Sequence, residues 1–229
     1  MRRIFSYFSK GEILLWLCSV LGIVLSFCLF DRENVLTLVA SVIGVTSLIF
    51  CAKGNPIGQV LMVFFSITYG IISYACAYYG EMITYLTMTL PMAVFALISW
   101  LKNPYKDNHA EVKVNAISKK ETIFMFILTL CVTILFYYIL DAFGTANLLV
   151  STFSIATSFL AVYLTFRRSP YFALAYAAND VVLILLWTLA SLQKIKYLSV
   201  VVCFIAFLFN DIYGFLSWQR MKKRQSLGQ

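Results

Sequence analysis

The sequence predicts an all-α integral membrane protein with eight transmembrane helices, and three observations lead to this fold class. Sixty-two per cent of the residues are hydrophobic and only 12% are charged, whereas soluble domains carry about 25% charged residues. Apolar runs of about 18 residues or more recur along the chain, long enough for a helix to cross the hydrocarbon layer. The chain also reads as two similar halves, which is typical of secondary transporters.

Eight apolar runs are separated by short polar gaps such as Gly80-Glu81, and we expect each run to form one membrane-spanning helix. The first run follows three basic residues, as a secretory signal would, but it is longer than a signal core and lacks a small-residue cleavage site. We therefore expect a retained helix there. The runs are 13–30, 35–52, 57–79, 82–101, 122–140, 148–166, 171–192 and 198–218.

Polar flanks of the first half recur in the second half, at an offset that drifts from 109 to 118 residues. The Ser-x-x-Glu flanks are capping boxes, which start helices. Trp100 and Trp218, which end the two halves, are interpreted as belt residues at the membrane interface. Because each half crosses four times, the halves enter from the same side and are parallel. The matched pairs are Ser9-Lys10-Gly11-Glu12 with Ser118-Lys119-Lys120-Glu121, Asn34 with Asn147, Lys53-Gly54-Asn55-Pro56 with Arg167-Arg168-Ser169-Pro170, and Trp100 with Trp218.

Basic residues predict the orientation. Fifteen of the 18 Lys and Arg residues fall on the side that carries both termini. The positive-inside rule predicts that this is the cytoplasmic side of the cell membrane. Lys and Arg residues beside the anionic headgroups of the lipid bilayer explain the net charge of +8. We therefore expect no nucleic-acid partner. The expected segments are a first repeat, 1–101, a cytoplasmic loop, 102–121, a second repeat, 122–218, and a basic cytoplasmic tail, 219–229.

The sequence lacks the patterns of metal sites and of nucleophilic catalysis. His109 is the single histidine and lies in the predicted loop, and the six cysteines fall in apolar runs without C-x-x-C spacing. We interpret these cysteines as small buried hydrophobic residues. No phosphate-binding G-x-x-x-x-G-K-[ST] motif occurs. We expect no enzyme, no metal and no cofactor; an intramembrane aspartyl enzyme stays an alternative because two aspartates lie in the runs.

Those aspartates are the main candidates for a site. Asp180 and Asp211 are the only charged residues inside the eight runs, and they follow Asn179 and Asn210. Ionisable groups at such depth are costly and commonly mark a binding cavity or a pathway. The alternative is that the two Asn-Asp pairs hold neighbouring helices together. Trp187, eight residues after Asn179, can stack on a flat ring or anchor the helix at the interface.

At this point the motifs carry a resemblance. The second half reads S-P-Y-F-A-L-A-Y-A-A-N-D at 169–180 and F-L-F-N-D-I-Y-G-F-L-S-W at 207–218, and the first half has G-N-P-I-G-Q at 54–59 and the pattern of Pro91, Met92 and Trp100. Over residues 35–218 the chain resembles the PnuC-type nicotinamide riboside transporters, which are related to the SWEET sugar transporters. The resemblance implies two parallel three-helix bundles, 35–101 and 148–218, joined by a linker helix, 122–140, with 13–30 as an extra N-terminal helix.

The resemblance also implies a vitamin site between the bundles. Asn179, Trp187 and Asn210 match its polar and aromatic positions in the second half. The first half has Ser66 where an amide is expected, followed by Tyr69, and Ala93 where Gln is expected. Gln59 of the G-N-P-I-G-Q motif and the two aspartates complete the candidate set.

No Lys or Arg lies inside the runs, so a phosphate has no counter-charge there, whereas two carboxylates favour a cation. Nicotinamide riboside, a flat cation, is the leading substrate; thiamine or another nucleoside is the alternative. The resemblance implies import by facilitated diffusion through alternating access, followed by phosphorylation by a cytoplasmic nucleoside kinase. A channel and a membrane scaffold stay open as other classes of protein, and a homo-oligomer stays open as an assembly.

Overall fold

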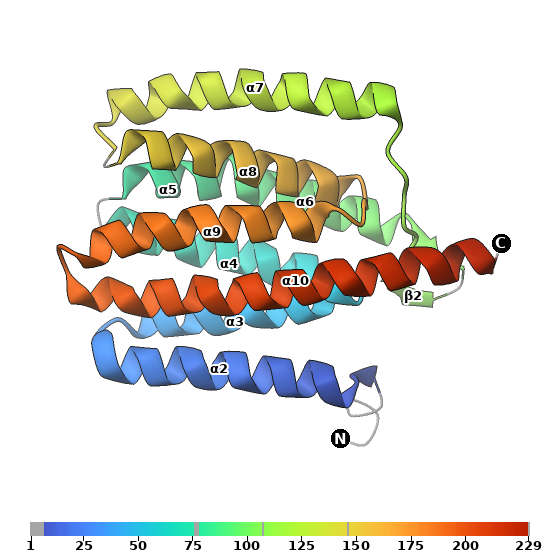
Figure 1. The fold of residues 1–229 in the computed structure, drawn as a ribbon, viewed down its shortest axis with the longest axis horizontal. Coiled ribbons are helices and arrows are strands. Elements are labelled where there is room, and N and C mark those ends of the chain that lie inside the picture. The colour runs from blue at the N-terminus through green and yellow to red at the C-terminus, as the bar shows by residue number, and fades with distance from the viewer. Residues whose placement is uncertain (1–6, 76–77, 107, 146, 229) are drawn as a thin grey trace.

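The computed structural model describes residues 7–75, 78–106, 108–145 and 147–228. Over these residues, eight helices are long and apolar enough to cross a membrane, as the sequence predicts. They lie side by side in one bundle (Figure 1). The start of the first helix and the end of the last lie at the same end of the bundle, here called the terminal end; the opposite end is called the far end.

The helices follow the apolar runs closely. The fourth span contains a π-helical segment, η1, that ends shortly before Pro91, whose nitrogen cannot donate a helical hydrogen bond. The elements are α2 (Lys10–Phe30), α3 (Val35–Ala52), α4 (Ile57–Ala75), α5 (Tyr79–Ile83), η1 (Thr84–Thr89), α6 (Leu90–Leu101), α7 (Lys119–Ala142), α8 (Leu148–Phe166), α9 (Phe172–Ser191), the 3-10 turn η2 (Ile195–Tyr197) and α10 (Leu198–Leu227).

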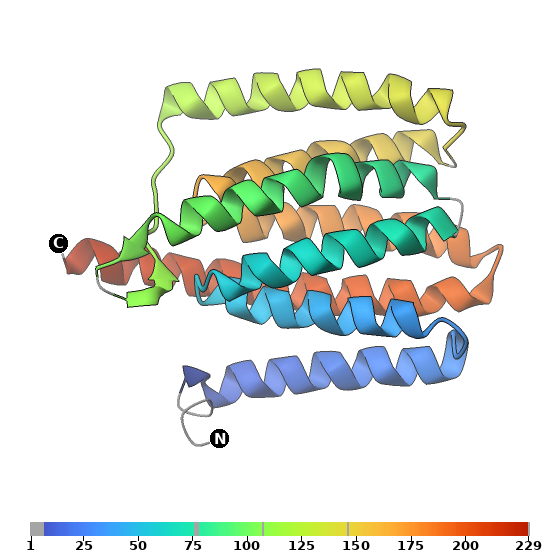
Figure 2. The ribbon, with the colours of Figure 1, turned by 180° about the vertical axis from the view of Figure 1, so that it is seen from behind.

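Three boundary predictions are wrong. Gly80-Glu81 is not a gap between spans, because α5 begins at Tyr79 and buries Glu81. The tail is helical, since residues 219–227 contain no helix breaker and α10 continues to Leu227. The 102–121 connection is not simply a loop: β1 (Pro104–Tyr105) and β2 (Asn108–Val112) form a two-stranded antiparallel sheet beside the end of α10 (Figure 2).

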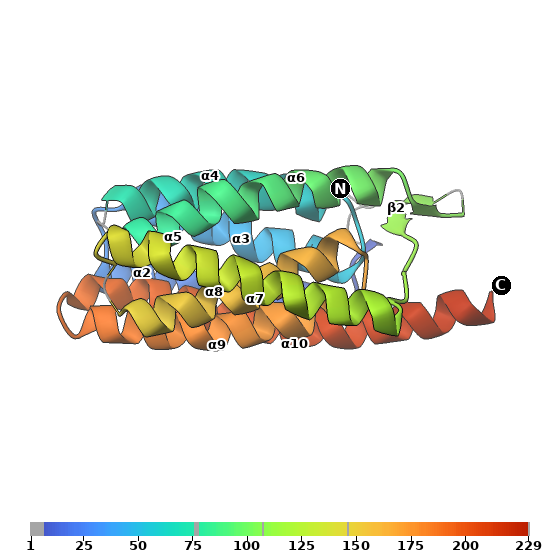
Figure 3. The ribbon, with the colours of Figure 1, turned by 90° about the horizontal axis from the view of Figure 1, so that it is seen from above.

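The helices pack in a pattern that repeats between the halves. Within each half consecutive helices are neighbours, and across the halves α3 packs against α10 as α6 packs against α8. Seen edge-on, α4 and α6 lie in one layer and α9 and α10 in the other (Figure 3). The first helix of each half, α2 or α7, lies at an outer edge of the bundle (Figure 1).

The repeated flanks make matching contacts. Ser9 and Glu12 form a capping box, and Glu12 pairs with Lys53 at the end of α3 at 3.2 Å. In the second half the Ser118 hydroxyl accepts from the Glu121 backbone N–H, and Glu121 pairs with Arg167 at the end of α8. Each outer helix is therefore held to its neighbour at the terminal end by an equivalent ion pair between a glutamate and a basic residue.

The two matched tryptophans are buried, so their interpretation as belt residues is wrong. Trp100 and Trp218 are both fully buried, and their rings lie 5.4 Å apart. The Trp100 indole donates to the Thr165 carbonyl of the second half at 2.9 Å, and the Trp218 indole donates to the Cys51 carbonyl of the first half at 2.8 Å. These reciprocal bonds join the halves at the terminal end.

The cysteines are only partly as expected. Cys51 and Cys203 are buried, whereas Cys18, Cys28 and Cys131 are exposed on the outer faces of their helices. Such faces suit lipid contact, and a thiol of low polarity fits there as well as in a core. Cys76, like Arg2 and Arg3 of the N-terminal charge cluster, lies outside the described residues.

Candidate functional site

A small cavity lies inside the bundle, enclosed by helices of both halves. The open space is about 20 Å³, which is room for about one water molecule. Both aspartates of the sequence prediction and Asn179 line it. The full lining is Leu48, Met62, Phe65, Tyr85, Thr89, Ser158, Tyr176, Asn179, Asp180, Phe204, Phe207 and Asp211.

The two aspartates meet in this cavity. Asp180 of α9 is 3% exposed and Asp211 of α10 is 4% exposed, and their carboxyl groups lie close enough to interact electrostatically. Two ionised carboxylates in one buried site repel each other, so at least one of the pair is protonated. Among the described residues that line the cavity there is no Lys or Arg. The pair therefore presents at most one negative charge, without a cationic side chain beside it.

Asn179 is oriented by two hydroxyl groups of α8. Its Oδ1 atom accepts from Thr157 Oγ1 at 2.8 Å and from Ser158 Oγ at 3.0 Å. Both bonds end on the carbonyl oxygen, so the amide nitrogen is the part of the side chain left for a ligand. The sequence analysis missed Thr157 and Ser158, because hydroxyl residues are common in membrane helices and neither stands in a motif.

Trp187 and Tyr69 form an aromatic layer between the cavity and the far end. The Trp187 indole donates to Tyr69 Oη at 2.8 Å, and its ring lies 4.8 Å from Tyr78 and 5.4 Å from Tyr197. Tyr69 in turn contacts Phe65, which lines the cavity. Trp187 therefore does not line the cavity with Asn179; it lies behind Tyr69 and closes the cavity from the far end.

The other predicted residues lie outside the cavity lining. The Asn210 amide donates to Ser19 Oγ of α2 at 2.9 Å and to the Ala206 carbonyl, so it joins α10 to the outer helix. Ser66 donates to the Met62 carbonyl of its own helix. Gln59 donates to Cys51 Sγ at 3.2 Å, between α4 and α3.

The cavity is asymmetric although the scaffold repeats. Pro56 and Pro170 are 114 residues apart, and this offset matches Phe65 with Asn179. Trp100 and Trp218 are 118 residues apart, which matches Ala93 with the position of Asp211. The first half thus supplies a mainly aromatic and aliphatic wall, and the second half supplies most of the polar one. The absence of the expected amides from the first half is part of this difference between the two walls.

A further buried acid, Glu81, was missed because Gly80-Glu81 was interpreted as a gap. Glu81 is 3% exposed in α5, where its side chain lies near Ser154 of α8. It does not line the cavity. Within the described residues, no group of three or more His, Cys, Asp or Glu side chains could hold a metal ion.

An enclosed polar cavity between the matched halves of a membrane-spanning bundle is the arrangement of a membrane transporter. The chain matches the family model described as nicotinamide mononucleotide transporter over residues 34–220. It therefore belongs to this family, whose members are transporters and not enzymes.

Named relatives and a solved structure agree with this assignment. A nicotinamide riboside transporter PnuC of Neisseria mucosa is 26% identical over 217 residues, covering 92% of this chain and 82% of that protein. The PnuC of Haemophilus influenzae is 22% identical over 193 residues, covering 84% and 82%. The crystal structure of the vitamin B3 transporter PnuC superimposes with a TM-score of 0.83 at 21% identity, covering 95% and 94%.

The cavity wall leads to a first prediction, at Gly44 of α3. A Cβ atom there would lie 2.3 Å from Cζ of Phe207 and 3.1 Å from Phe65, two residues that line the cavity. We expect Gly44→Ala to push these rings and to lower the free energy of unfolding by about 1–3 kcal/mol, as overpacking does. Thermal denaturation of the purified protein measures the change.

Gly22→Ala is the matched control, because nothing lies within 4 Å of the Cβ atom that it would add. Alanine is the better helix former, so this variant should keep or raise the melting temperature. Equal melting temperatures for the two variants would contradict the packing described around Phe207.

Proposed function

We propose that the chain carries nicotinamide riboside across the membrane by facilitated diffusion, through alternating access to the central cavity. The observation that carries the proposal is the Asp180–Asp211 pair, two carboxyl groups in an enclosed cavity that together present at most one negative charge. A ligand with a single positive charge complements that pair. The amide of Asn179 and the hydroxyl of Ser158 suit ribose hydroxyls, and the aromatic lining suits a flat ring. Both named relatives are riboside transporters.

The family is described as nicotinamide mononucleotide transporter. The carboxyl groups of the cavity nevertheless favour the riboside over the mononucleotide as substrate. A phosphate monoester brings about −1.5 to −2 charges at pH 7. It would face two carboxyl groups without a basic residue in the described lining. Transfer of such an anion into an enclosed site without a counter-charge is strongly unfavourable. Thiamine, another flat cation, meets the same charge requirement and is the competing substrate.

The closed cavity supports alternating access. Its 20 Å³ of open space cannot hold a nucleoside, so binding requires the walls to move apart. The Tyr69–Trp187 layer lies on one side of the cavity, and the reciprocal Trp100–Trp218 contacts lie on the other. We infer that these two aromatic layers open in turn. Flux would follow the substrate gradient, and a nucleoside kinase in the cytoplasm would maintain it by converting the imported riboside to a phosphorylated product.

The substrate site is tested by uptake into liposomes. We expect Asn179→Ala to weaken the apparent affinity for nicotinamide riboside about 5- to 150-fold, because one polar contact of about 1–3 kcal/mol is lost. Trp187→Ala should abolish uptake by removing the far-end layer. Asp180→Asn and Asp211→Asn should keep downhill flux at lower affinity, since the amide retains the shape without the charge.

Asp141→Asn is the control, because Asp141 is exposed at the end of α7. Its uptake should equal that of the original protein. If Asn179→Ala, Asp180→Asn and Asp211→Asn also behaved like this control, the cavity would not be the substrate site. Competition by thiamine in the same assay decides between the two flat cations.

We also propose that the terminal end lies on the cytoplasmic side of the cell membrane, because the predicted topology assigns 15 of the 18 Lys and Arg residues to that side. Single cysteines can be placed at Lys106, Lys119 and Lys194, all of which are exposed. In a cysteine-free background, a membrane-impermeant reagent added to intact cells should label position 194 and leave positions 106 and 119 unlabelled. Labelling of 106 or 119 in sealed cells would contradict this orientation.

A further inference from the structure

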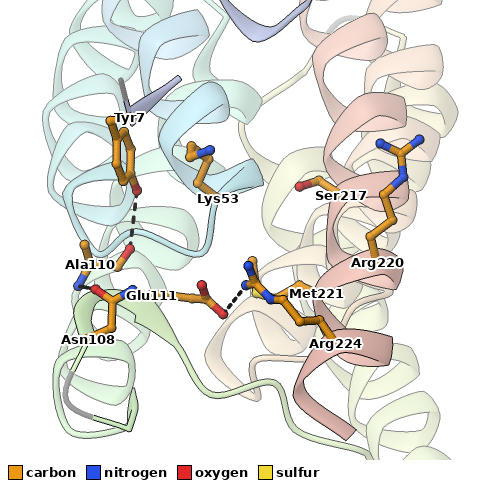
Figure 4. A pocket seen from close by; sticks show the side chains of 9 residues that line it. All are labelled: Tyr7, Lys53, Asn108, Ala110, Glu111, Ser217, Arg220, Met221 and Arg224. Carbon is orange, nitrogen blue, oxygen red and sulfur yellow. Dashed lines mark hydrogen bonds and ion pairs between the residues drawn. The ribbon is translucent and has the colours of Figure 1, made fainter. Parts of the chain in front are cut away.

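Another open space, separate from the transport cavity, lies at the terminal end. It is a cleft of about 370 Å³ between the end of α3, the β-sheet and α10 (Figure 4). In Figure 4, Lys53 lies on one wall and Ser217 on the facing wall. The nine lining residues are Tyr7, Lys53, Asn108, Ala110, Glu111, Ser217, Arg220, Met221 and Arg224.

The walls of the cleft are held in place by the sheet. The backbone N–H of Val112 donates to the Gly54 carbonyl of the first half at 2.9 Å. On the other side, the Gln225 side chain of α10 accepts from the Val114 N–H at 2.8 Å and donates to the Val112 carbonyl at 3.1 Å. Strand β2 thus connects the α3–α4 turn to the extension of α10. These hydrogen bonds fix the walls of the cleft relative to each other.

The cleft is basic. Three of its nine lining residues are Lys or Arg, and one is acidic. Glu111 is already engaged, because it accepts from Arg224 at 2.5 Å and from Gln225 at 2.8 Å. Lys53 pairs with Glu12 at 3.2 Å, and Arg220 has no ion pair among the described residues.

The side chains of α10 that line the cleft share one helix face. Ser217, Arg220 and Arg224 are spaced by three and four residues, so they follow one another along the helix. This row offers a hydroxyl and two guanidinium groups, and Arg groups bind phosphate through paired N–H donors. Lys53 adds a point charge from the facing wall, and the Asn108 amide adds a neutral donor.

We propose that this cleft binds a phosphate group, with Arg220 and Arg224 on one side and Lys53 on the other. Its charge is opposite to that of the transport cavity, so one protein would hold a cation in its centre and a phosphate at its terminal end. The phosphate could belong to a soluble monoester, such as a mononucleotide, or to the headgroup of an anionic lipid. A ligand that bridges α3 and α10 would also stabilise the closed arrangement of the two halves.

Isothermal titration of the purified full chain tests the site, with nicotinamide mononucleotide as the soluble probe. We expect saturable binding that Arg220→Gln weakens tenfold or more. Lys223→Gln is the control, because it removes the same charge from α10 but does not line the cleft. Ser217→Asp, which places a carboxylate in the cleft, is a second variant with the same expected loss.

Lipid nanodiscs with and without phosphatidylglycerol separate the two sources of phosphate. If the lipid headgroup is the occupant, phosphatidylglycerol should raise the melting temperature of the original protein and of Lys223→Gln, but not of Arg220→Gln. Absence of both effects in the original protein, or equal effects in the Arg220 and Lys223 variants, would overturn the proposal. Riboside binding, titrated on the same samples, reports on the central cavity, so failure of the transport proposal would be seen separately.

Discussion

Two carboxyl groups in contact inside a membrane-spanning bundle are the constraint on which this structure depends. Asp180 and Asp211 are almost completely buried, and among the described residues that line their cavity there is no basic one. Burial of an unpaired charge is strongly unfavourable. A bound proton lowers that cost in the closed cavity, and a cationic ligand would offset what remains. The protein thus keeps an ionisable pair at its centre, and the proposed cationic substrate would complement its charge.

The rest of the bundle encloses that pair. Aromatic layers lie on both sides of it, around Tyr69 and Trp187 towards the far end and around Trp100 and Trp218 towards the terminal end. Exclusion of water strengthens the attraction between a carboxylate and a cation. The outer helices contribute in another way: the Glu12–Lys53 and Glu121–Arg167 pairs hold them at the terminal end, away from the cavity.

The scaffold was more predictable from sequence than the site, for physical reasons. Helix-start signals and chain reversals depend on local residues, so the Ser9 and Ser118 flanks could be paired from sequence alone, and the structure gives them matching contacts. Trp100 and Trp218 were misplaced, because local sequence does not distinguish an interfacial tryptophan from a buried one. Their indoles bond to Thr165 and Cys51 of the opposite halves. The residues around each tryptophan in the sequence do not indicate such long-range contacts.

The same limit applies within the site. Asn179 and Asp180 both line the cavity, whereas Asn210, directly before Asp211, faces α2. Adjacent helical residues point about 100° apart, so a motif alone does not determine which member meets a ligand. Glu81 was missed because a glycine and an acid at the edge of an apolar run look like a turn. In the structure that segment is helical as α5 and packs against α4.

The central claim is that the cavity selects its ligand by one positive charge. Its most direct test compares binding of nicotinamide riboside with binding of the reduced, dihydropyridine form, which has nearly the same shape but is neutral. Titration of both into the purified protein isolates the effect of the charge from that of the ribose and the amide. The account predicts that the oxidised, cationic riboside binds at least tenfold more tightly. Equal affinity, or preference for the neutral form, would contradict it.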